Sequence, residues 1–348
     1  MSLRHRIDLV IPGLFGPVPV HPSDLPATPI LARLLGRADR YFYPGRDPVS
    51  ALLDCFGIEP AQGEDLPSAP FCRLADLQGV DSAGYVMHAD PVYLRPDRDR
   101  LLLFDAQHLG LSCDESDVLI DLFNRHFDQD GLRLEAAAPE RWYLHVQRPP
   151  HLRTTPLHMT IGRSISGLLP KGEDASIWAR FLNEAQMLFH HAETNQVRER
   201  EGRPTVSAIW PWGGGQLPDA FPTPRYASVF AADALALGLA VATNVQYSPV
   251  PENVEALIES VARGSVLVHW DGLWRPVLAA DGAGWIAGMR QFESWLGPLL
   301  RGWSGLGNAR IHIHPCNGEC FEVGAWGLHR FWRRPYALGM RLGRAVRA

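Results

Sequence analysis

The N-terminal residues alternate between an apolar run and amphipathic stretches. Residues 7–16 (IDLVIPGLFG) are almost continuously apolar and end in a Pro-Gly turn, which is typical of a buried strand in a parallel sheet. Residues 28–38 follow with helical spacing, with Thr28 as the expected N-cap and proline at the next position. Residues 47–58 repeat this arrangement with Asp47 as the cap. A buried strand followed by helices predicts an α/β core.

The pattern changes between about residue 71 and residue 165. YVMHADPVYLRP and RLLLFDAQHL are predicted strands joined by a short turn, and LRLEAAAPERWYLHVQ is predicted to form two more strands. Between these pairs, CDESDVLIDLFNRHF is a predicted helix whose apolar side chains share one face. Strands paired around a helix indicate an α+β insert with an antiparallel sheet.

The alternation of strands and helices resumes near residue 206, after a long amphipathic helix at 174–192. The linker-like stretch 59–70, rich in proline, glycine and acidic residues, precedes the change of pattern. We therefore predict a mostly parallel α/β core with helices on both faces, formed by 1–65 and 206–348 and interrupted by an α+β domain at 66–205. A chain of 348 residues is long enough for two such domains.

Charge and cysteine content exclude several classes of protein. A net charge of −5 argues against nucleic-acid binding, which needs a clustered basic excess. Five scattered cysteines imply no disulfide framework. The apolar run near the N-terminus is too short for a signal peptide, and no stretch approaches the ~18 apolar residues of a membrane span. We expect a cytoplasmic protein without a membrane partner.

One candidate binding site is the stretch HHAETNQVREREGRP (190–204). Asn195 and Arg198 are three residues apart and would point the same way from a helix, where an amide and a guanidinium suit a phosphate or carboxylate. Gly213, Gly214 and Gly215 follow the next strand and would let backbone N–H groups approach a ligand. The alternative is a solvated helix end followed by a flexible turn.

A second candidate lies in IHIHPCNGEC near the C-terminus. His312 and His314 share one face of a predicted strand, and Cys316 and Cys320 follow a proline turn, a spacing that could hold zinc. The alternative is that these histidines are half-buried residues of a sheet. We find no serine-hydrolase, phosphate-loop or dinucleotide-binding motif.

The order of these segments resembles the archaeal-type, cofactor-independent phosphoglycerate mutases. The segment 182–218 is similar to a stretch of that family in which a helix, an Asn-xx-Arg pattern and a Gly-rich turn follow one another. Three other segments, TPILARLLG, LLDCFGIEP and LVHWDG, resemble further segments of the family in the same order. The matching positions are Asn183, Glu184, Asn195, Arg198, Gly202, Gly213 and Gly215. Within that family, the chain resembles a proteobacterial branch known as RpfE-type regulatory proteins. The resemblance implies an alkaline-phosphatase-like core and a site where two Mn, Zn or Mg ions activate a serine.

The chain departs from the family at the positions that carry this chemistry. Pro12 stands where the family has a metal-binding aspartate, Pro48 and Val49 stand near the place of the serine, and Trp274 to Leu278 supply neither of two further ligands. Residues 315–317 (PCN) replace Gly-Asp-His, whereas His329 keeps a last histidine. Proline cannot hold a divalent cation through its side chain.

We therefore expect a catalytically degenerate, phosphoglycerate-mutase-like protein with a binding or regulatory role, without cofactor, metal or catalytic residues. Asn195, Arg198, the three glycines and His329 would line a residual site for a phosphorylated or carboxylated metabolite or for a protein partner. The first alternative is an active mutase or phosphatase whose metal ligands have moved to other residues (Asp8, Asp24, Asp47, Asp54, Asp271 and Asp281). The second alternative is a protein–protein interaction module.

Overall fold

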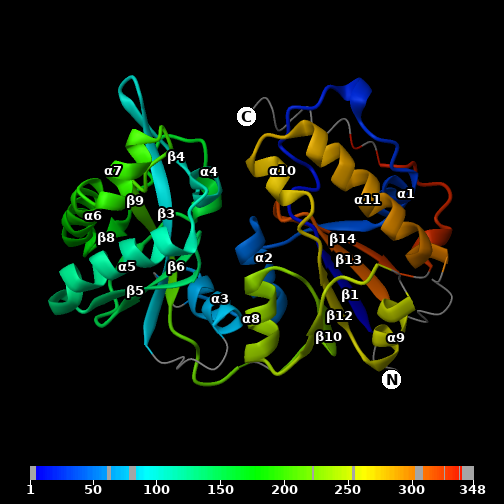
Figure 1. The fold of residues 1–348 in the computed structure, drawn as a ribbon. Helices are drawn as coiled ribbons and strands as arrows, with labels where there is room; N and C mark the ends of the chain where they lie inside the picture. Colours follow the sequence, from blue (N-terminus) through cyan, green and yellow to red (C-terminus); the bar gives the residue numbers. More distant parts are fainter. Residues whose placement is uncertain are drawn as a thin grey trace. The chain divides into compact units, whose positions relative to one another are not determined.

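The computed structural model describes residues 5–60, 64–77, 84–221, 223–252, 255–301, 309–324, 326–336 and 338. The chain divides into two compact units, which we call the core unit (1–58 and 221–348) and the inserted unit (59–220). Figure 1 shows both units with their helices and strands labelled.

The core unit is built on a seven-stranded sheet in the order β11-β10-β12-β1-β13-β14-β2. The first five strands in this order are parallel, and β14 runs antiparallel to both β13 and β2. Their bounds are β1 Arg6–Val10, β2 Asp39–Phe42, β10 Ser228–Phe230, β11 Gln246–Ser248, β12 Val266–His269, β13 Arg310–His314 and β14 Glu319–Gly324. The sequence patterns did not indicate β14 or the edge strand β2, whose four residues are all exposed.

Helices cover both faces of this sheet (Figure 1). One face carries Ile7 and Leu9 of β1 and packs in an apolar cluster with α1, α9 and α11. The opposite face carries polar side chains of β1 and β13 and lies on the side of α2 and α8. The helices are α1 Pro29–Arg37, α2 Pro48–Phe56, α8 Ala234–Ala242, α9 Glu255–Arg263, α10 Trp274–Leu278 and α11 Gly282–Arg301.

The inserted unit contains an antiparallel sheet centred on β3. This long strand pairs with β6, β9 and β4 along different parts of its length, and β5 pairs with β6. The strands are β3 Tyr85–Asp97, β4 Arg100–Phe104, β5 Leu132–Ala138, β6 Arg141–Val146 and β9 Ala208–Gly215, beside a small β7 Leu152–Arg153 and β8 Lys171–Gly172 pair.

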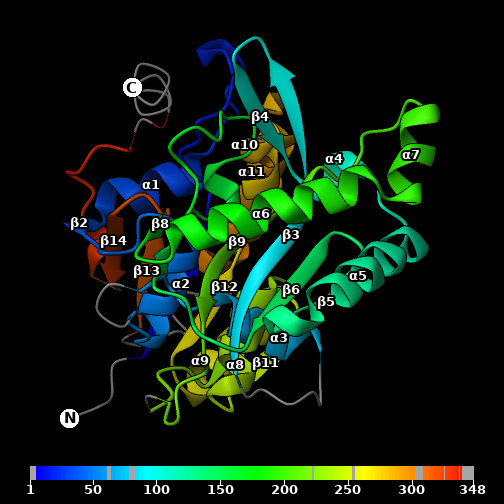
Figure 2. The ribbon, with the colours of Figure 1, turned by 90° about the vertical axis from the view of Figure 1, so that its left-hand side faces the viewer.

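Helices of the inserted unit also cover both faces of its sheet. Figure 2 shows α5 Cys113–Phe127 and α6 Ala175–His190 lying across one face, where they share an apolar core with the sheet. The helix α3 Ser68–Asp76 packs against β3 and β9, and α4 Ala106–Leu109 and α7 Glu193–Arg200 complete the unit. Ser112 and Glu115 form a capping box at the start of α5, as the sequence of this helix suggests.

The predicted fold class is confirmed: a largely parallel α/β core is interrupted by an antiparallel α+β domain. The expected boundary at residue 206 differs from the structure, because β9 pairs with β3 of the inserted unit and not with the core sheet. The local pattern of β9 specifies a strand but not its partner. Among the described residues, no helix has both the length and the apolar character needed to cross a bilayer.

Candidate functional site

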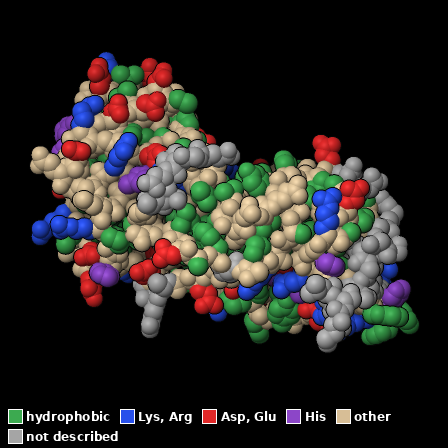
Figure 3. Space-filling model, turned by 90° about the horizontal axis from the view of Figure 1, so that it is seen from below, with side chains coloured by type: hydrophobic (Ala, Val, Ile, Leu, Met, Phe, Trp, Pro, Cys, Tyr) green, Lys and Arg blue, Asp and Glu red, His purple; other side chains and the backbone are tan. Residues whose placement is uncertain are grey.

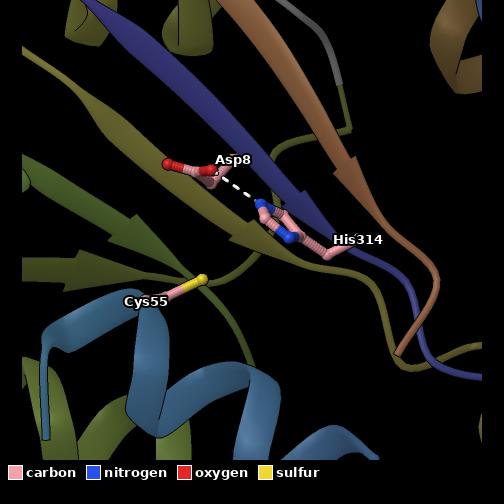
Figure 4. Close-up of side chains that lie close together, drawn as sticks. All are labelled: Asp8, Cys55 and His314. Carbon is pink, nitrogen blue, oxygen red and sulfur yellow. Dashed lines mark hydrogen bonds and ion pairs between the residues drawn. The ribbon is translucent and has the colours of Figure 1, made fainter. Parts of the chain in front are cut away.

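Strand register brings three polar side chains onto one face of the core sheet. Asp8 of β1 lies opposite His312 of β13, and Val10 lies opposite His314. Because side chains alternate along a strand, Asp8, His312 and His314 share one face, whereas Ile7 and Leu9 point to the other. Cys55, near the end of α2, lies over this polar face, so three separate elements contribute to one buried cluster (Figure 4).

Asp8 and His314 form a buried ion pair within this cluster. The Nε2 atom of His314 lies 2.8 Å from Oδ1 of Asp8, as the dashed line in Figure 4 marks. Arg6 donates to the same carboxylate oxygen at 2.7 Å, and the Tyr226 hydroxyl donates to the other at 3.1 Å. The Sγ atom of Cys320 lies 3.9 Å from Nε2 of His314. The side chains of Asp8 and His314 are almost completely inaccessible to solvent.

The charges of this cluster follow from its contacts. Burial alone would raise the pKa of Asp8, but hydrogen bonds and charges from His314 and Arg6 outweigh it and lower this pKa to about 2. Burial alone would lower the pKa of His314, but Cys55, Asp8 and Cys320 raise it well above its ordinary value. Burial also raises the pKa of the Cys55 thiol. A carboxylate, an imidazolium and a neutral thiol therefore meet in the interior at neutral pH.

Asp8, Cys55 and His314 can also be regarded as a set of metal ligands. Among the described residues, they form the only group of three histidine, cysteine or acidic side chains whose ligand atoms all lie within 4.8 Å of one another. A sulfur, an imidazole nitrogen and a carboxylate oxygen are donors that suit zinc.

The zinc site predicted from the sequence is only half assembled. His314 and Cys320 do approach each other, but Nδ1 of His312 lies 3.0 Å from the Tyr41 hydroxyl. Cys316 occupies a left-handed turn with φ 62°, and its thiol donates to the His314 carbonyl. The spacing of residues in the sequence did not indicate Asp8 and Cys55 as neighbours of His314, because they join the cluster only through the sheet register and the packing of α2.

The carboxyl-terminal edge of the core sheet is the place where open α/β folds bind ligands. Here the chain after β1 begins with Ile11, Pro12 and Gly13, and the chain after β13 begins with Pro315 and Cys316. At the N-terminus of α2, Asp47 accepts hydrogen bonds from the backbone of Val49 and Ser50 and from the Ser50 hydroxyl at 2.6 Å. The described residues do not fit a centre that holds two metal ions, since the group of possible ligands that they form, Asp8, Cys55 and His314, supplies one carboxylate and one imidazole.

Asn195 and Arg198 have structural roles in the inserted unit. Arg198 is completely buried and donates to the carbonyls of Pro204 and Leu109 and to the Glu115 carboxylate. The amide of Asn195 donates to two carbonyls and accepts from the backbone N–H of Val206 at 2.9 Å. Arg198 thus has no exposed surface for an anion, and the burial of both side chains also differs from the solvated helix end of the alternative. A cavity of about 230 Å³ is lined in part by Asn195 but not by Arg198.

The three glycines of β9 allow neighbouring elements to pack closely. Gly213 has φ +61°, and a Cβ atom there would collide with the Ser68 hydroxyl of α3. Cβ atoms at Gly214 and Gly215 would collide with Tyr85 and Pro67. The glycine run is therefore part of a strand and not the ligand-binding turn that we expected. His329 is exposed in a short 3-10 helix of the core unit, and its role as a ligand contact stays a prediction.

The core unit also has a cavity of about 660 Å³ that the sequence analysis missed. It lies beyond the carboxyl ends of β10, β11 and β12, and α11 forms one wall. The rings of Trp270 and Trp295, whose centroids are 5.3 Å apart, line it together with Glu252 and Asp271. Trp270, which directly follows β12, and Trp295 of α11 become neighbours only after folding, so no local motif marked this site.

Comparison with known proteins identifies distant relatives of the chain. No protein-family model matches it. A protein of Methanothermobacter thermautotrophicus named 2,3-bisphosphoglycerate-independent phosphoglycerate mutase 2 is 29% identical over 265 residues, which cover 72% of this chain and 58% of that protein. A phosphoglycerate mutase of the same type from Methanosarcina mazei is 25% identical over 184 residues, which cover 51% of this chain and 43% of that protein. The matches span less than two thirds of either mutase.

A solved structure of a Pyrococcus horikoshii protein has the same fold as this chain. The two superpose with a TM-score of 0.51 at 15% sequence identity, and the match covers 98% of this chain and 93% of the other. The chain thus has distant relatives named cofactor-independent phosphoglycerate mutases, together with an alkaline-phosphatase-type α/β fold.

Proposed function

We propose that this chain is a phosphoglycerate-mutase-like protein that no longer transfers phosphoryl groups and that acts by binding a ligand in a regulatory role. One observation carries the proposal. At the carboxyl-terminal edge of the core sheet, Pro12 and Cys316 follow the strands that would present metal ligands, while Asp47 and Ser50 are hydrogen-bonded to each other in the cap of α2.

The chemistry of phosphoryl transfer supports this interpretation. Two metal ions that clamp the attacking and leaving oxygens need several carboxylates and imidazoles in one place. Asp281, one of the candidate replacements, accepts a hydrogen bond from the Gly284 backbone in the first turn of α11. Asp8, another candidate, lies in the interior of the sheet with Arg6 and His314. Asp8 and Asp281 thus have other partners, and among the described residues the six candidates do not come together as one group of ligands.

The cavity beside β12 is the best candidate for the ligand site. Glu252 and Asp271 place two carboxylates in its lining, and none of its described lining residues is a lysine or arginine. Two tryptophan rings offer flat apolar surfaces and favour cations over their faces. The cavity therefore favours an aromatic ligand that is neutral or carries an amine, over the phosphorylated or carboxylated metabolite that the sequence suggested.

The surface is consistent with a partner other than nucleic acid. On the face shown in Figure 3, basic and acidic side chains are interspersed over the described surface. A nucleic-acid footprint requires basic side chains to gather on one face.

A coupled assay tests the loss of catalysis. The full chain is incubated with 3-phosphoglycerate and Mn²⁺, Mg²⁺ or Zn²⁺, and formation of 2-phosphoglycerate is followed through enolase. We expect no turnover above that of a sample with EDTA. Turnover that depends on metal and disappears with EDTA would overturn the proposal and establish the alternative, an active mutase with relocated ligands.

Thermal-shift measurements test the ligand class independently of catalysis. The panel consists of three indole compounds and one compound without a ring. The indole compounds are tryptamine, which is a cation, indole, which is neutral, and indole-3-acetate, which is an anion. The compound without a ring is the anion 3-phosphoglycerate. We expect tryptamine to raise the Tm most, and Glu252→Gln to reduce its advantage over indole. Glu259→Gln, on the exposed side of α9, is the matched control and should leave both shifts unchanged. A larger shift with 3-phosphoglycerate contradicts the assignment, and no shift at all favours the protein-interaction alternative.

A further inference from the structure

We propose that Asp8, Cys55 and His314 form an interior binding site for a soft divalent cation, Zn²⁺ in particular, with Cys320 as the fourth ligand. The site lies on the polar face of the core sheet, with Asp8 in the middle of β1 and His314 as the last residue of β13. It does not depend on the proposed function. The four residues belong to β1, α2, β13 and β14, so the cation would join four elements of the core unit.

Three of the four ligand atoms lie at distances that approach those of a tetrahedral site. Zinc binds oxygen, nitrogen and sulfur at about 2.0 to 2.3 Å, which places ligand atoms about 3.3 to 3.8 Å from one another. The ligand atoms of Asp8, Cys55 and His314 already lie within 4.8 Å of one another. To admit the ion, the 2.8 Å contact between His314 Nε2 and Asp8 Oδ1 must open slightly while the sulfur of Cys55 moves inward.

Cys320 supplies the fourth donor from the neighbouring strand. Its sulfur lies 3.9 Å from Nε2 of His314, close to the nitrogen–sulfur separation of a zinc site. The Cys320 side chain is completely buried, and no disulfide involves it or Cys55. Both sulfurs are therefore present as free thiols beside the same imidazole.

Charge is conserved when the ion enters. Without metal, the Asp8 carboxylate and the His314 imidazolium cancel, and Cys55 is a neutral thiol. Binding of Zn²⁺ breaks the N–H bond of His314 and the S–H bond of Cys55, forms Zn–N, Zn–S and Zn–O bonds, and releases two protons to solvent. The three ligands and the ion then sum to zero charge, as before. If Cys320 binds as a thiolate it releases a third proton, and its negative charge is offset by Arg6, which donates to Asp8 at 2.7 Å.

The other ring nitrogen of His314 does not face the proposed ion. Nδ1 of His314 is buried without a hydrogen-bond partner among the described residues. A buried donor that lacks a partner costs more when its group is charged. Metal binding at Nε2 replaces the proton that faces Asp8 and leaves the Nδ1 N–H as it is, so the support for the site comes from the distances between the ligand atoms.

The donor set selects the metal. Two sulfurs, one nitrogen and one oxygen suit Zn²⁺, whereas Mg²⁺ and Ca²⁺ prefer sites made of oxygen ligands only. Because Asp8, Cys55 and His314 are all buried, the ion must enter during folding or through local opening. Loading should therefore be tested during refolding.

The experiment refolds the full chain from denaturant with Zn²⁺ or Co²⁺, removes free metal by gel filtration, and measures bound metal by mass spectrometry. We expect a stoichiometric ion and, with Co²⁺, the strong near-ultraviolet absorption of thiolate ligation. Cys55→Ser and Cys320→Ser should lose that absorption. The matched controls are Cys316→Ser, a buried cysteine of the same region, and Cys113→Ser, an exposed one, and both should keep it.

A second measurement needs no variant and stays decisive if Cys55→Ser fails to fold. Refolding of the wild-type chain in weak buffer should release two to three more protons per bound ion with Zn²⁺ than without it, and the affinity should rise about 100-fold or more per pH unit while His314 and Cys55 remain protonated. Substoichiometric metal after refolding, or binding without proton release, overturns the proposal. Equal Co²⁺ absorption in wild type and folded Cys55→Ser overturns it as well.

Discussion

Ionisation of the Asp90 carboxyl group in the inserted unit should lower the free energy of unfolding as pH rises. The substitution Asp90→Asn should abolish this dependence. Asp90 is buried in β3 and accepts a hydrogen bond from Nε1 of Trp212 at 2.9 Å. Burial raises its pKa to about 7, even though this hydrogen bond and the charge of Arg141 favour the carboxylate. The unfolded chain therefore releases this proton at lower pH than the folded chain does, and stability falls as pH rises from about 4 to about 7.

The size of the effect follows from the difference between the two pKa values. With 3.8 for the unfolded state and about 7 for the folded state, the ionisation of Asp90 costs about 2 kcal/mol at pH 5 and about 4 kcal/mol at pH 8. Asp90→Asn keeps an oxygen acceptor for Trp212 and cannot ionise. The variant should gain about 2 to 3 kcal/mol relative to wild type between pH 5 and pH 8, whatever constant cost its amide adds.

Hydrogen exchange of the peptide that covers β3 measures this difference without assuming that the two units unfold together. Wild type and variant are compared at each pH, so intrinsic exchange rates cancel. The neighbouring His88, whose pKa burial lowers to about 3, affects both proteins equally. Asp97→Asn, at the exposed end of the same strand, is the control and should show no change with pH. An Asp90→Asn difference that is the same at pH 5 and pH 8 refutes the argument.

Three further substitutions test the structural roles of Arg198, Gly213 and Glu293. Arg198→Ala should lower the unfolding free energy of the inserted unit by about 3 kcal/mol or more in urea titrations, because it leaves buried acceptors unpaired, whereas exposed Arg200→Ala on the same helix should cost little. Equal effects would contradict the burial of Arg198. Gly213→Ala should lower the free energy of unfolding by about 1 to 3 kcal/mol more than Gly202→Ala does. Both glycines have positive φ, but only a Cβ atom at Gly213 would collide with a neighbour. Equal losses of Tm would refute this. Glu293→Ala should lower the free energy of unfolding by about 2 kcal/mol, because two backbone N–H groups of α1 lose their acceptor. Unchanged hydrogen exchange of those two amides would contradict this prediction.

Much of the fold could be predicted because its signals are local. The apolar run of β1, the cap of α2 by Asp47 and the Ser112–Glu115 capping box each involve residues a few positions apart. Such patterns act through backbone hydrogen bonds and the period of the helix or strand, so they can be interpreted before any partner is known. The change from helix–strand alternation to paired strands likewise indicated the insert.

The candidate sites depended on contacts between distant parts of the chain. Asp8 and His314 are separated by 306 positions and meet only because β1 and β13 pair in parallel. The Asn195–Arg198 pair has a motif suited to an anion, yet packing buried both side chains and used their donors inside the unit. A local pattern specifies which groups a segment carries and how they are spaced. Which groups face water, and which face one another, depends on strand register and on the helices packed above, and these are set by the hydrophobic core as a whole.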